Sequence, residues 1–342
     1  MRDYENKLLA QYCIDVIGSR KMRGGFLCDT KQGVLRLKEL SSSEKKIPYV
    51  DYIYKQLSET GFSTVDYIIP DAQGSTVCGV QDYGNYILTK WFIGRECDVY
   101  KEKEVLEATK TLARLHNSLD VVSEQITEMQ KQLLYDNRWE YFQNQSLVVK
   151  WKRHNKGLNK VRGYIRSKVH KGRFEHIYLE RFNEVYTIAE EVVKRLEKSE
   201  YYLLYEYALK HNQLIHGDYN HHNVLFVGNQ VAVTNFEHFR IDIPIADFYY
   251  FLRKVMEKRS WDEKVGRKML NAYCEIREIS KQEKEYLALR LMYPEKFWKI
   301  TNYYYNTNKA WISEKNVEKL IISINQMEIK REFVQHIFSF HL

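Results

Sequence analysis

Apolar and polar positions follow different patterns in different parts of the chain, and each pattern predicts a kind of element. Near the N-terminus, Leu8, Leu9, Tyr12 and Val16 recur at helical spacing. This spacing predicts a short amphipathic helix over residues 1–17.

Glycines then separate two strand-like runs, GGFLCDT over 24–30 and GVLRLKEL over 33–40. The tripeptide Lys31-Gln32-Gly33 between them fits a hairpin connection, in which Gly33 supplies a positive φ. Residues 44–60 are predicted to form a helix that stops at Gly61. Three short strands are expected to follow, in TVDYIIP, STVCGV and NYILTKWF.

From residue 98 onward the pattern becomes mainly helical. A helix is expected over 98–119, and several long helices are expected within 125–215. A compact β-rich island at 216–244 interrupts the helices, which resume at Ile245. The change of pattern predicts an α+β chain with a boundary near residues 93–95. We expect a small N-terminal lobe, 1–93, and a larger helical lobe, 94–342.

Length and composition agree with two lobes. The chain has 342 residues, more than the roughly 100–200 residues of an ordinary domain. Hydrophobic residues make up 44%, and the net charge is only +8. No apolar stretch is long enough for a membrane span or a signal peptide, so neither is expected. The chain has five cysteines, and they form no CxxC pair. This pattern predicts a reducing compartment rather than a disulfide framework.

The segment richest in chemistry is HGDYNHHN, residues 216–223, which lies between apolar runs. A polar loop of this kind suits phosphoryl transfer. Asp218 could orient or deprotonate an attacking hydroxyl, and Asn223 could present its amide oxygen to Mg²⁺. Gly217 allows the backbone to turn sharply beside a ligand.

This segment resembles the H-x-D-x-x-x-x-N catalytic loop of kinase-fold phosphotransferases such as aminoglycoside and choline kinases. The resemblance narrows to the CotS-like spore-coat proteins of endospore-forming bacteria. Seven blocks carry it in register along the chain: LRLKEL (35–40), NYILTKWFIGRE (85–96), LARLHNSL (112–119), LIHGDYNHHNVLF (214–226), NFEHFRIDIPIADFYYFLRK (235–254), LNAY (270–273) and RLMYPEKFW (290–298). It implies a two-lobed, protein-kinase-like α+β fold with a nucleotide-binding N-terminal lobe.

The resemblance also implies roles in nucleotide binding. Lys38 would contact the nucleotide phosphates, and Glu44 would be its ion-pair partner. Trp91, Phe92 and Ile93 would form the hinge against the adenine. The implied cofactors are ATP and Mg²⁺.

A second group of implied roles belongs to the catalytic loop, 216–223. Asp218 would be the catalytic base and Asn223 a metal ligand. His216 would be structural and pack beneath the loop. Asp247 would bind backbone amides of the loop from the helix below.

The chain departs from the family pattern at the expected metal strand, 231–237. The family motif begins with Asp, usually as I-D-x-[DE], whereas this chain has Asn235. Asn235 offers a neutral oxygen without charge, so the metal site is expected to be weakened. Glu237 would point to the same side if the strand continues, and could partly substitute. The segment 18–25 also lacks a G-x-G-x-x-G pattern.

The sequence also allows other interpretations. HGDYNHHN could be an ordinary polar turn, or His216, His221 and His222 could bind zinc. Arg36 could take the place of Lys38. Glu44 and Asp247 could be ordinary helix-start residues.

A basic, aromatic-rich stretch at 150–173 could bind nucleic acid or another anionic polymer, but a solvated helical face is the more frequent meaning of such a run.

Two functions follow from these observations. The first is a spore-coat-associated, kinase-fold protein whose phosphotransfer is weak or absent because of Asn235. The second is an active ATP-dependent kinase that phosphorylates a hydroxyl with Asp218 as base. The expected partners are nucleotide and spore-coat proteins, with no membrane. We expect synthesis in the mother-cell cytoplasm and deposition in the coat.

Overall fold

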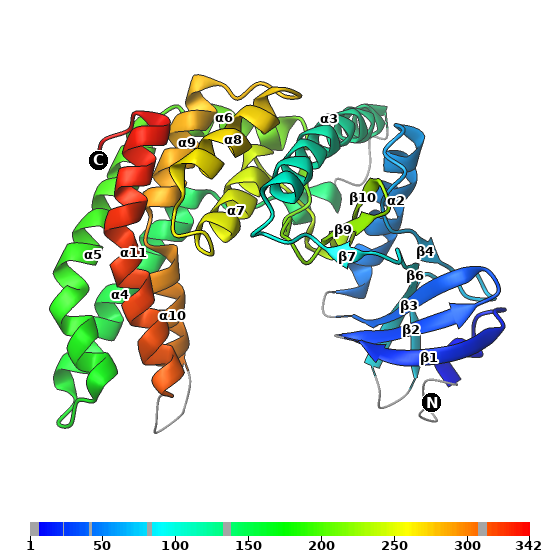
Figure 1. The fold of residues 1–342 in the computed structure, drawn as a ribbon, viewed down its shortest axis with the longest axis horizontal. Coiled ribbons are helices and arrows are strands. Elements are labelled where there is room, and N and C mark those ends of the chain that lie inside the picture. Colours follow the sequence, from blue (N-terminus) through cyan, green and yellow to red (C-terminus); the bar gives the residue numbers. More distant parts are fainter. Residues whose placement is uncertain (1–6, 23, 41–42, 81–83, 133–137, 307–312) are drawn as a thin grey trace. The chain divides into compact units, whose positions relative to one another are not determined.

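The computed structural model describes residues 7–22, 24–40, 43–80, 84–132, 138–306 and 313–342. The chain forms two compact units (Figure 1). The first comprises Met1–Phe142 and His211–Phe251, and the second Gln143–Lys210 and Leu252–Leu342. The catalytic-loop segment therefore belongs to the same compact unit as the N-terminal strands. The sequence-based division into lobes 1–93 and 94–342 stays a prediction.

An antiparallel sheet forms the N-terminal part of the first unit. Its strands are β1 (Val16–Met22), β2 (Gly25–Thr30), β3 (Gly33–Glu39), β4 (Ile68–Ile69), β5 (Cys78–Val80) and β6 (Gly84–Lys90). They lie in the order β1-β2-β3-β6-β4, and β5 also pairs with β6. The β2–β3 hairpin pairs Thr30 with Gly33, whose φ is +112°, as the sequence predicted.

Alternation along β3 gives the sheet two different faces. Leu35 and Leu37 are buried in a core with residues such as Leu8 and Leu88. Successive side chains of a strand point to opposite faces. Arg36 and Lys38 therefore leave the sheet on the face away from this core, and this side carries the candidate site.

The N-terminal helix is shorter than the sequence predicted. Residues 7–9 are helical, residues 1–6 lie outside the described part, and Val16 already begins β1. Leu8, Leu9 and Tyr12 nevertheless pack in the core of the sheet. The apolar spacing identified buried positions correctly, but the pairing of Val16 with Thr30 ends any helix before it.

The helix after β3 agrees with its prediction. A short 3₁₀ turn, η1 (Glu44–Lys46), leads into α2 (Ile47–Glu59). Its buried residues recur at helical spacing: Ile47, Val50, Ile53, Tyr54 and Leu57. The helix ends just before Gly61, whose φ is +86°.

The expected β-rich island is present, and it pairs with the segment that follows β6. It consists of β8 (Leu214–Ile215), β9 (Val224–Val227), β10 (Gln230–Val233), η3 (Phe236–His238) and β11 (Arg240–Ile241). The strand β7 (Arg95–Glu96) pairs with β9. The long helix α3 (Glu102–Gln132), preceding η2 (Arg138–Phe142), extends well beyond the predicted end at 119.

The second unit is helical. Its helices are α4 (Leu147–Ser167), α5 (Arg173–Lys198), α6 (Tyr201–Lys210), the end of α7 (Ile245–Met256), α8 (Glu263–Cys274), α9 (Lys281–Met292), α10 (Glu295–Asn306) and α11 (Glu314–Phe338). Helices α4, α5, α10 and α11 pack together (Figure 1). Stacked aromatic rings fill their core, such as Phe174 on Tyr304 with centroids 4.5 Å apart.

The basic stretch at 150–173 spans α4 and the start of α5. Trp151 is fully buried within it, so this aromatic is a core residue. Several cations of the stretch form ion pairs: Lys152 with Glu197, Lys168 with Glu175, and Arg173 with Glu314.

Within the described part of the chain, no helix is both long and apolar enough to cross a membrane. All five cysteines are free, and three of them are buried.

Two helical glycines provide a test of the packing in the second unit. A Cβ at Gly266 would lie 2.4 Å from the ring of Phe333, whereas one at Gly163 would meet nothing within 4 Å. We expect Gly266→Ala to lower the free energy of unfolding by about 1–3 kcal/mol through overpacking. Gly163→Ala should raise it by about 1 kcal/mol through helix propensity. Urea unfolding measures both, and equal effects would contradict this packing.

Candidate active site

The loop 216–223 is held from below by a buried carboxylate. Asp247, in the first turn of α7, accepts hydrogen bonds from the backbone amides of His216 (2.7 Å) and Gly217 (2.9 Å). This is the contact that the resemblance implied for it. Gly217 has φ +80°, and a Cβ there would lie 1.9 Å from the carbonyl oxygen of His238. The sharp turn therefore requires glycine.

Burial alone would raise the pKa of Asp247, but His116 and His216 beside it reverse the effect, and the pKa lies below its ordinary value. The His116 Nε2 atom lies 3.6 Å from the Asp247 carboxylate. His116 belongs to the LARLHNSL block, yet sequence reasoning assigned it no role. The carboxylate thus stays ionised in the interior, which strengthens its hydrogen bonds to the loop.

His216 is fully buried, and protein groups occupy both of its ring nitrogens. Nε2 donates to the Thr234 carbonyl (2.9 Å), and Nδ1 accepts from the Asp218 amide (3.1 Å). His222 bonds to Glu96 through Nδ1 (2.6 Å). These bonds leave His216 no nitrogen for a zinc ion. In the described ranges, His, Cys, Asp and Glu side chains form no cluster of three or more that could hold a metal.

Asp218 and Asn223, the two residues of loop 216–223 that are predicted to take part in catalysis, contact each other. The Asn223 amide nitrogen donates to the Asp218 carbonyl oxygen (2.8 Å) and to its carboxylate Oδ2 (3.0 Å). The Asn223 amide oxygen accepts from the Asn235 amide at 3.4 Å. The structure therefore brings Asp218, Asn223 and Asn235 into one chain of hydrogen bonds.

Lys38 reaches the same place from β3. Its ammonium forms a hydrogen bond with the Asn235 amide oxygen and an ion pair with the Glu237 carboxylate. Lys38 and Glu237 have side chains only 12% and 3% exposed. Burial lowers the pKa of Lys38, and Glu237 opposes that shift by favouring the charged ammonium.

The expected Lys38–Glu44 ion pair is a prediction that the structure corrects. Glu44 is exposed, and its carboxylate accepts a hydrogen bond from Asn85. It lies in η1, one turn before α2, so its side chain does not share the buried face of that helix. That face presents Tyr54 instead, whose hydroxyl accepts from the Phe236 amide (3.1 Å).

The predicted metal strand, 231–237, is also corrected. Strand β10 ends at Val233, and Asn235 takes a left-handed conformation with φ 74° and ψ 54°. Glu237 follows within the turn η3. Asn235 and Glu237 therefore do not face the same way through strand alternation. They lie close together because both contact the Lys38 ammonium.

Sequence reasoning missed Asp66, a buried carboxylate between α2 and β4. Its Oδ2 accepts the Asn235 backbone amide at 2.9 Å and so supports the left-handed turn. Its Oδ1 is buried and has no hydrogen-bond partner. Burial raises the pKa of Asp66 to about 6, although Arg36 and Lys38 act in the opposite direction. Only its place in the strand-like run TVDYIIP could have hinted at burial.

The predicted hinge lies between β6 and β7. Trp91 and Phe92 are half-buried, and Ile93 is 70% exposed. The Trp91 amide donates to the Val34 carbonyl (3.0 Å), and Arg36 lies over the Trp91 ring. The adenine contact stays a prediction. The segment 18–25 is part of the β1–β2 hairpin, with residue 23 outside the described part.

The fold and the loop define a class, the kinase-like phosphotransferase fold. The chain is similar to an aminoglycoside phosphotransferase from Alicyclobacillus acidocaldarius, with a TM-score of 0.81 and 16% identity over 98% of this chain and 95% of that one. It is also similar to the spectinomycin phosphotransferase APH(9)-Ia bound to ADP and spectinomycin (TM-score 0.61, 14% identity, 96% and 97% covered). The amicoumacin kinase hAmiN in complex with AMP-PNP and Ca²⁺ is a third similar structure (TM-score 0.58, 15% identity, 96% and 92% covered).

Within this class the family is more specific. Residues 5–337 match the family model described as "Spore coat putative kinase YutH". The chain belongs to this spore-coat kinase family.

Asp66 provides a pH test. The native state raises its pKa from 3.8 to about 6, so it binds this proton more tightly than the unfolded chain. The stability contribution is therefore present at low pH and is lost as the pH rises toward 6, by about 3 kcal/mol in total. Asp66→Asn lacks this loss, so its stability relative to the wild type should increase between about pH 4 and about pH 7.5.

Urea unfolding across this pH range measures the difference. Asp15→Asn, at an exposed carboxylate, is the matched control and should show no comparable change. A constant difference between the wild type and Asp66→Asn at all pH values would contradict a buried, titrating Asp66.

Proposed function

We propose that this protein acts in the spore coat as a kinase-fold protein whose phosphotransfer is weak or absent. One observation supports this most directly: Asn235 replaces a metal-binding carboxylate, and its amide oxygen already accepts a hydrogen bond from Lys38. A Mg²⁺ ion at this oxygen would have to compete with an ammonium group.

The charges around Asn235 support the same proposal. Two cations, Arg36 and Lys38, face the carboxylates of Asp66 and Glu237. These four charges sum to zero, and the Asp218 carboxylate, which accepts a hydrogen bond from Asn223, adds a negative charge beside them. Mg²⁺ in kinase sites is usually held by one or two carboxylates together with substrate phosphates. A locally neutral site attracts such an ion less strongly.

A second candidate function is active phosphotransfer to a hydroxyl. One buried oxygen of Glu237, Oε2, has no hydrogen-bond partner and could serve as a metal ligand beside Asn223. In this alternative, Glu237 would supply the charge that Asn235 lacks, and Asp218 would act as the base.

Family membership supports the location. We expect the protein to be made in the mother cell and deposited in the coat through contacts with other coat proteins.

A thermal-shift titration with ATP, with and without Mg²⁺, tests the proposal. Asn235→Asp restores a carboxylate and should tighten Mg²⁺-dependent ATP binding by about tenfold, which raises the unfolding temperature by mass action. The wild type should show little metal-dependent shift. Asn229→Asp adds the same charge in the exposed β9–β10 turn and should behave as the wild type. A wild-type shift as large as that of Asn235→Asp would favour the second candidate.

If the wild type does bind Mg²⁺-ATP, Asp218→Ala separates binding from chemistry. The loop is held through the backbone amides of His216 and Gly217, so this variant should remain folded. ATP turnover should then fall by about 10²–10⁴-fold, as expected for loss of a general base. Turnover that is unchanged in Asp218→Ala would exclude Asp218 as the base.

A further inference from the structure

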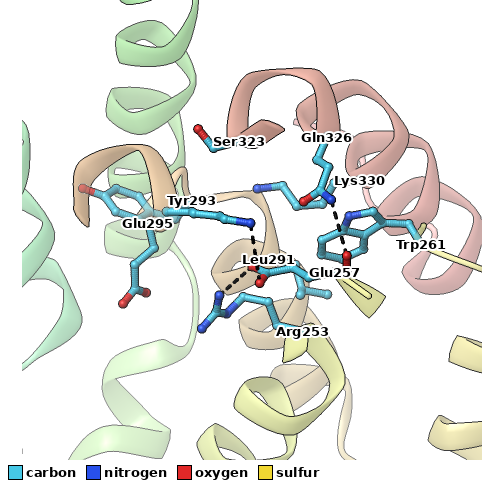
Figure 2. A pocket seen from close by; sticks show the side chains of 10 residues that line it. Arg253, Glu257, Trp261, Leu291, Tyr293, Glu295, Ser323, Gln326 and Lys330 are labelled. Carbon is cyan, nitrogen blue, oxygen red and sulfur yellow. Dashed lines mark hydrogen bonds and ion pairs between the residues drawn. The ribbon is translucent and has the colours of Figure 1, made fainter. Parts of the chain in front are cut away.

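A small pocket lies in the second unit, and none of its lining residues belongs to the candidate active site. It lies among the end of α7, the start of α10 and the middle of α11, it is partly open to solvent, and its cavity volume is about 30 Å³ (Figure 2). Arg253, Lys296 and Lys330 bring three cationic groups to its wall. Leu291 and Trp261 supply apolar surface.

The acidic residues of the pocket are already engaged. Glu257 accepts a hydrogen bond from Arg253 (2.6 Å) through one oxygen, as Figure 2 shows. Its other oxygen lies 3.8 Å from the Lys296 ammonium. Glu295 pairs with Lys299 at 3.1 Å. In Figure 2 its carboxylate points away from Lys330.

Lys330 is left without a counter-ion. Its ammonium points into the pocket (Figure 2), and no described residue forms an ion pair or a hydrogen bond with it. The side chain is half-buried. Burial lowers the pKa of Lys330 to about 8, Glu257 opposes the shift, and Arg253 adds to it. An unpaired cation in a half-buried position is costly to the fold unless an anion joins it.

A second unsatisfied donor lines the same pocket. Trp261 is only 4% exposed, and its indole N–H has no hydrogen-bond partner. The nitrogen lies on the side of Gln326 and Lys330 in Figure 2. Left-handed φ values at Ser260 and Trp261, 49° and 59°, and an edge contact with the Phe333 ring, set its orientation. Buried indole N–H groups usually find an acceptor.

From these two groups we infer that the pocket binds a small oxyanion, a phosphate or a carboxylate. The Lys330 ammonium would pair with the anion, and the Trp261 indole would donate to one of its oxygens. Arg253 and Lys296 add positive potential around it. The small enclosed volume favours a ligand of a few heavy atoms over a polymer. None of these residues belongs to the kinase site, so this inference is independent of the proposed function.

Calorimetric titration with inorganic phosphate, and separately with acetate, tests the inference and identifies the oxyanion. We expect one of them to bind the wild type, and Lys330→Met to bind it about tenfold more weakly or not at all. Without added anion, Lys330→Met should be at least as stable as the wild type, because it removes an unpaired cation. Lys319→Met removes an exposed lysine of the same helix and should bind like the wild type.

Lys45→Met removes an exposed lysine of the first unit and controls for binding outside the pocket, so it should leave the affinity unchanged. Binding that is retained in Lys330→Met would overturn the inference, as would the absence of binding by both probes to the wild type.

A second measurement does not depend on any variant. Trace acetylation at about pH 8, read by mass spectrometry, reports the reactivity of each lysine. The bound oxyanion should slow acetylation of Lys330 about threefold or more and leave Lys319 unaffected. Equal rates for Lys330 with and without the anion would contradict its binding there.

Discussion

The ammonium of Lys38 joins β3 to a distant part of the chain, because its partners Asn235 and Glu237 lie 197 and 199 residues further along the sequence. It lies on the polar face of the β3 strand, and it contacts both Asn235 and Glu237 in the segment after β10. A cation this deeply buried needs a counter-charge, and Glu237 supplies it. The same contact occupies the Asn235 amide oxygen and one carboxylate oxygen of Glu237, and it leaves Glu237 Oε2 without a hydrogen-bond partner.

The residues that hold the loop 216–223 in place are different from the residues that are predicted to bind a metal. Asp247 holds the catalytic loop through backbone amides, and His116 keeps that carboxylate ionised. Neither residue contacts the place where a nucleotide phosphate or a metal is expected. The loop can keep its kinase-like shape whether or not Asn235 supports metal binding. This separation is the physical reason why a kinase-like fold does not by itself establish kinase activity.

The two units differ in whether their buried and half-buried cations have counter-charges. In the first, Lys38 and Arg36 face Glu237 and Asp66, so positive and negative charges balance without any ligand. In the second, Glu257 is shared by Arg253 and Lys296, and Lys330 remains unpaired beside an indole N–H that also lacks a partner. A balanced cluster has little need of an ionic ligand, whereas an unbalanced one favours an anion. The same electrostatic reasoning thus supports a weakened metal site in one unit and an anion site in the other.

The sequence by itself determined the α+β class, the hairpin at Gly33, the end of α2 before Gly61, the β island around HGDYNHHN and the family, because these depend on local spacing and on contiguous motifs. It also identified Lys38, Asp218, Asn223 and Asn235, which the tertiary structure brings together. Only the tertiary structure decided that Lys38 pairs with Glu237 rather than Glu44, and that Asp66 supports Asn235. Both contacts join distant segments, and both depend on the left-handed turn at Asn235, whose direction no local pattern of apolar residues encodes.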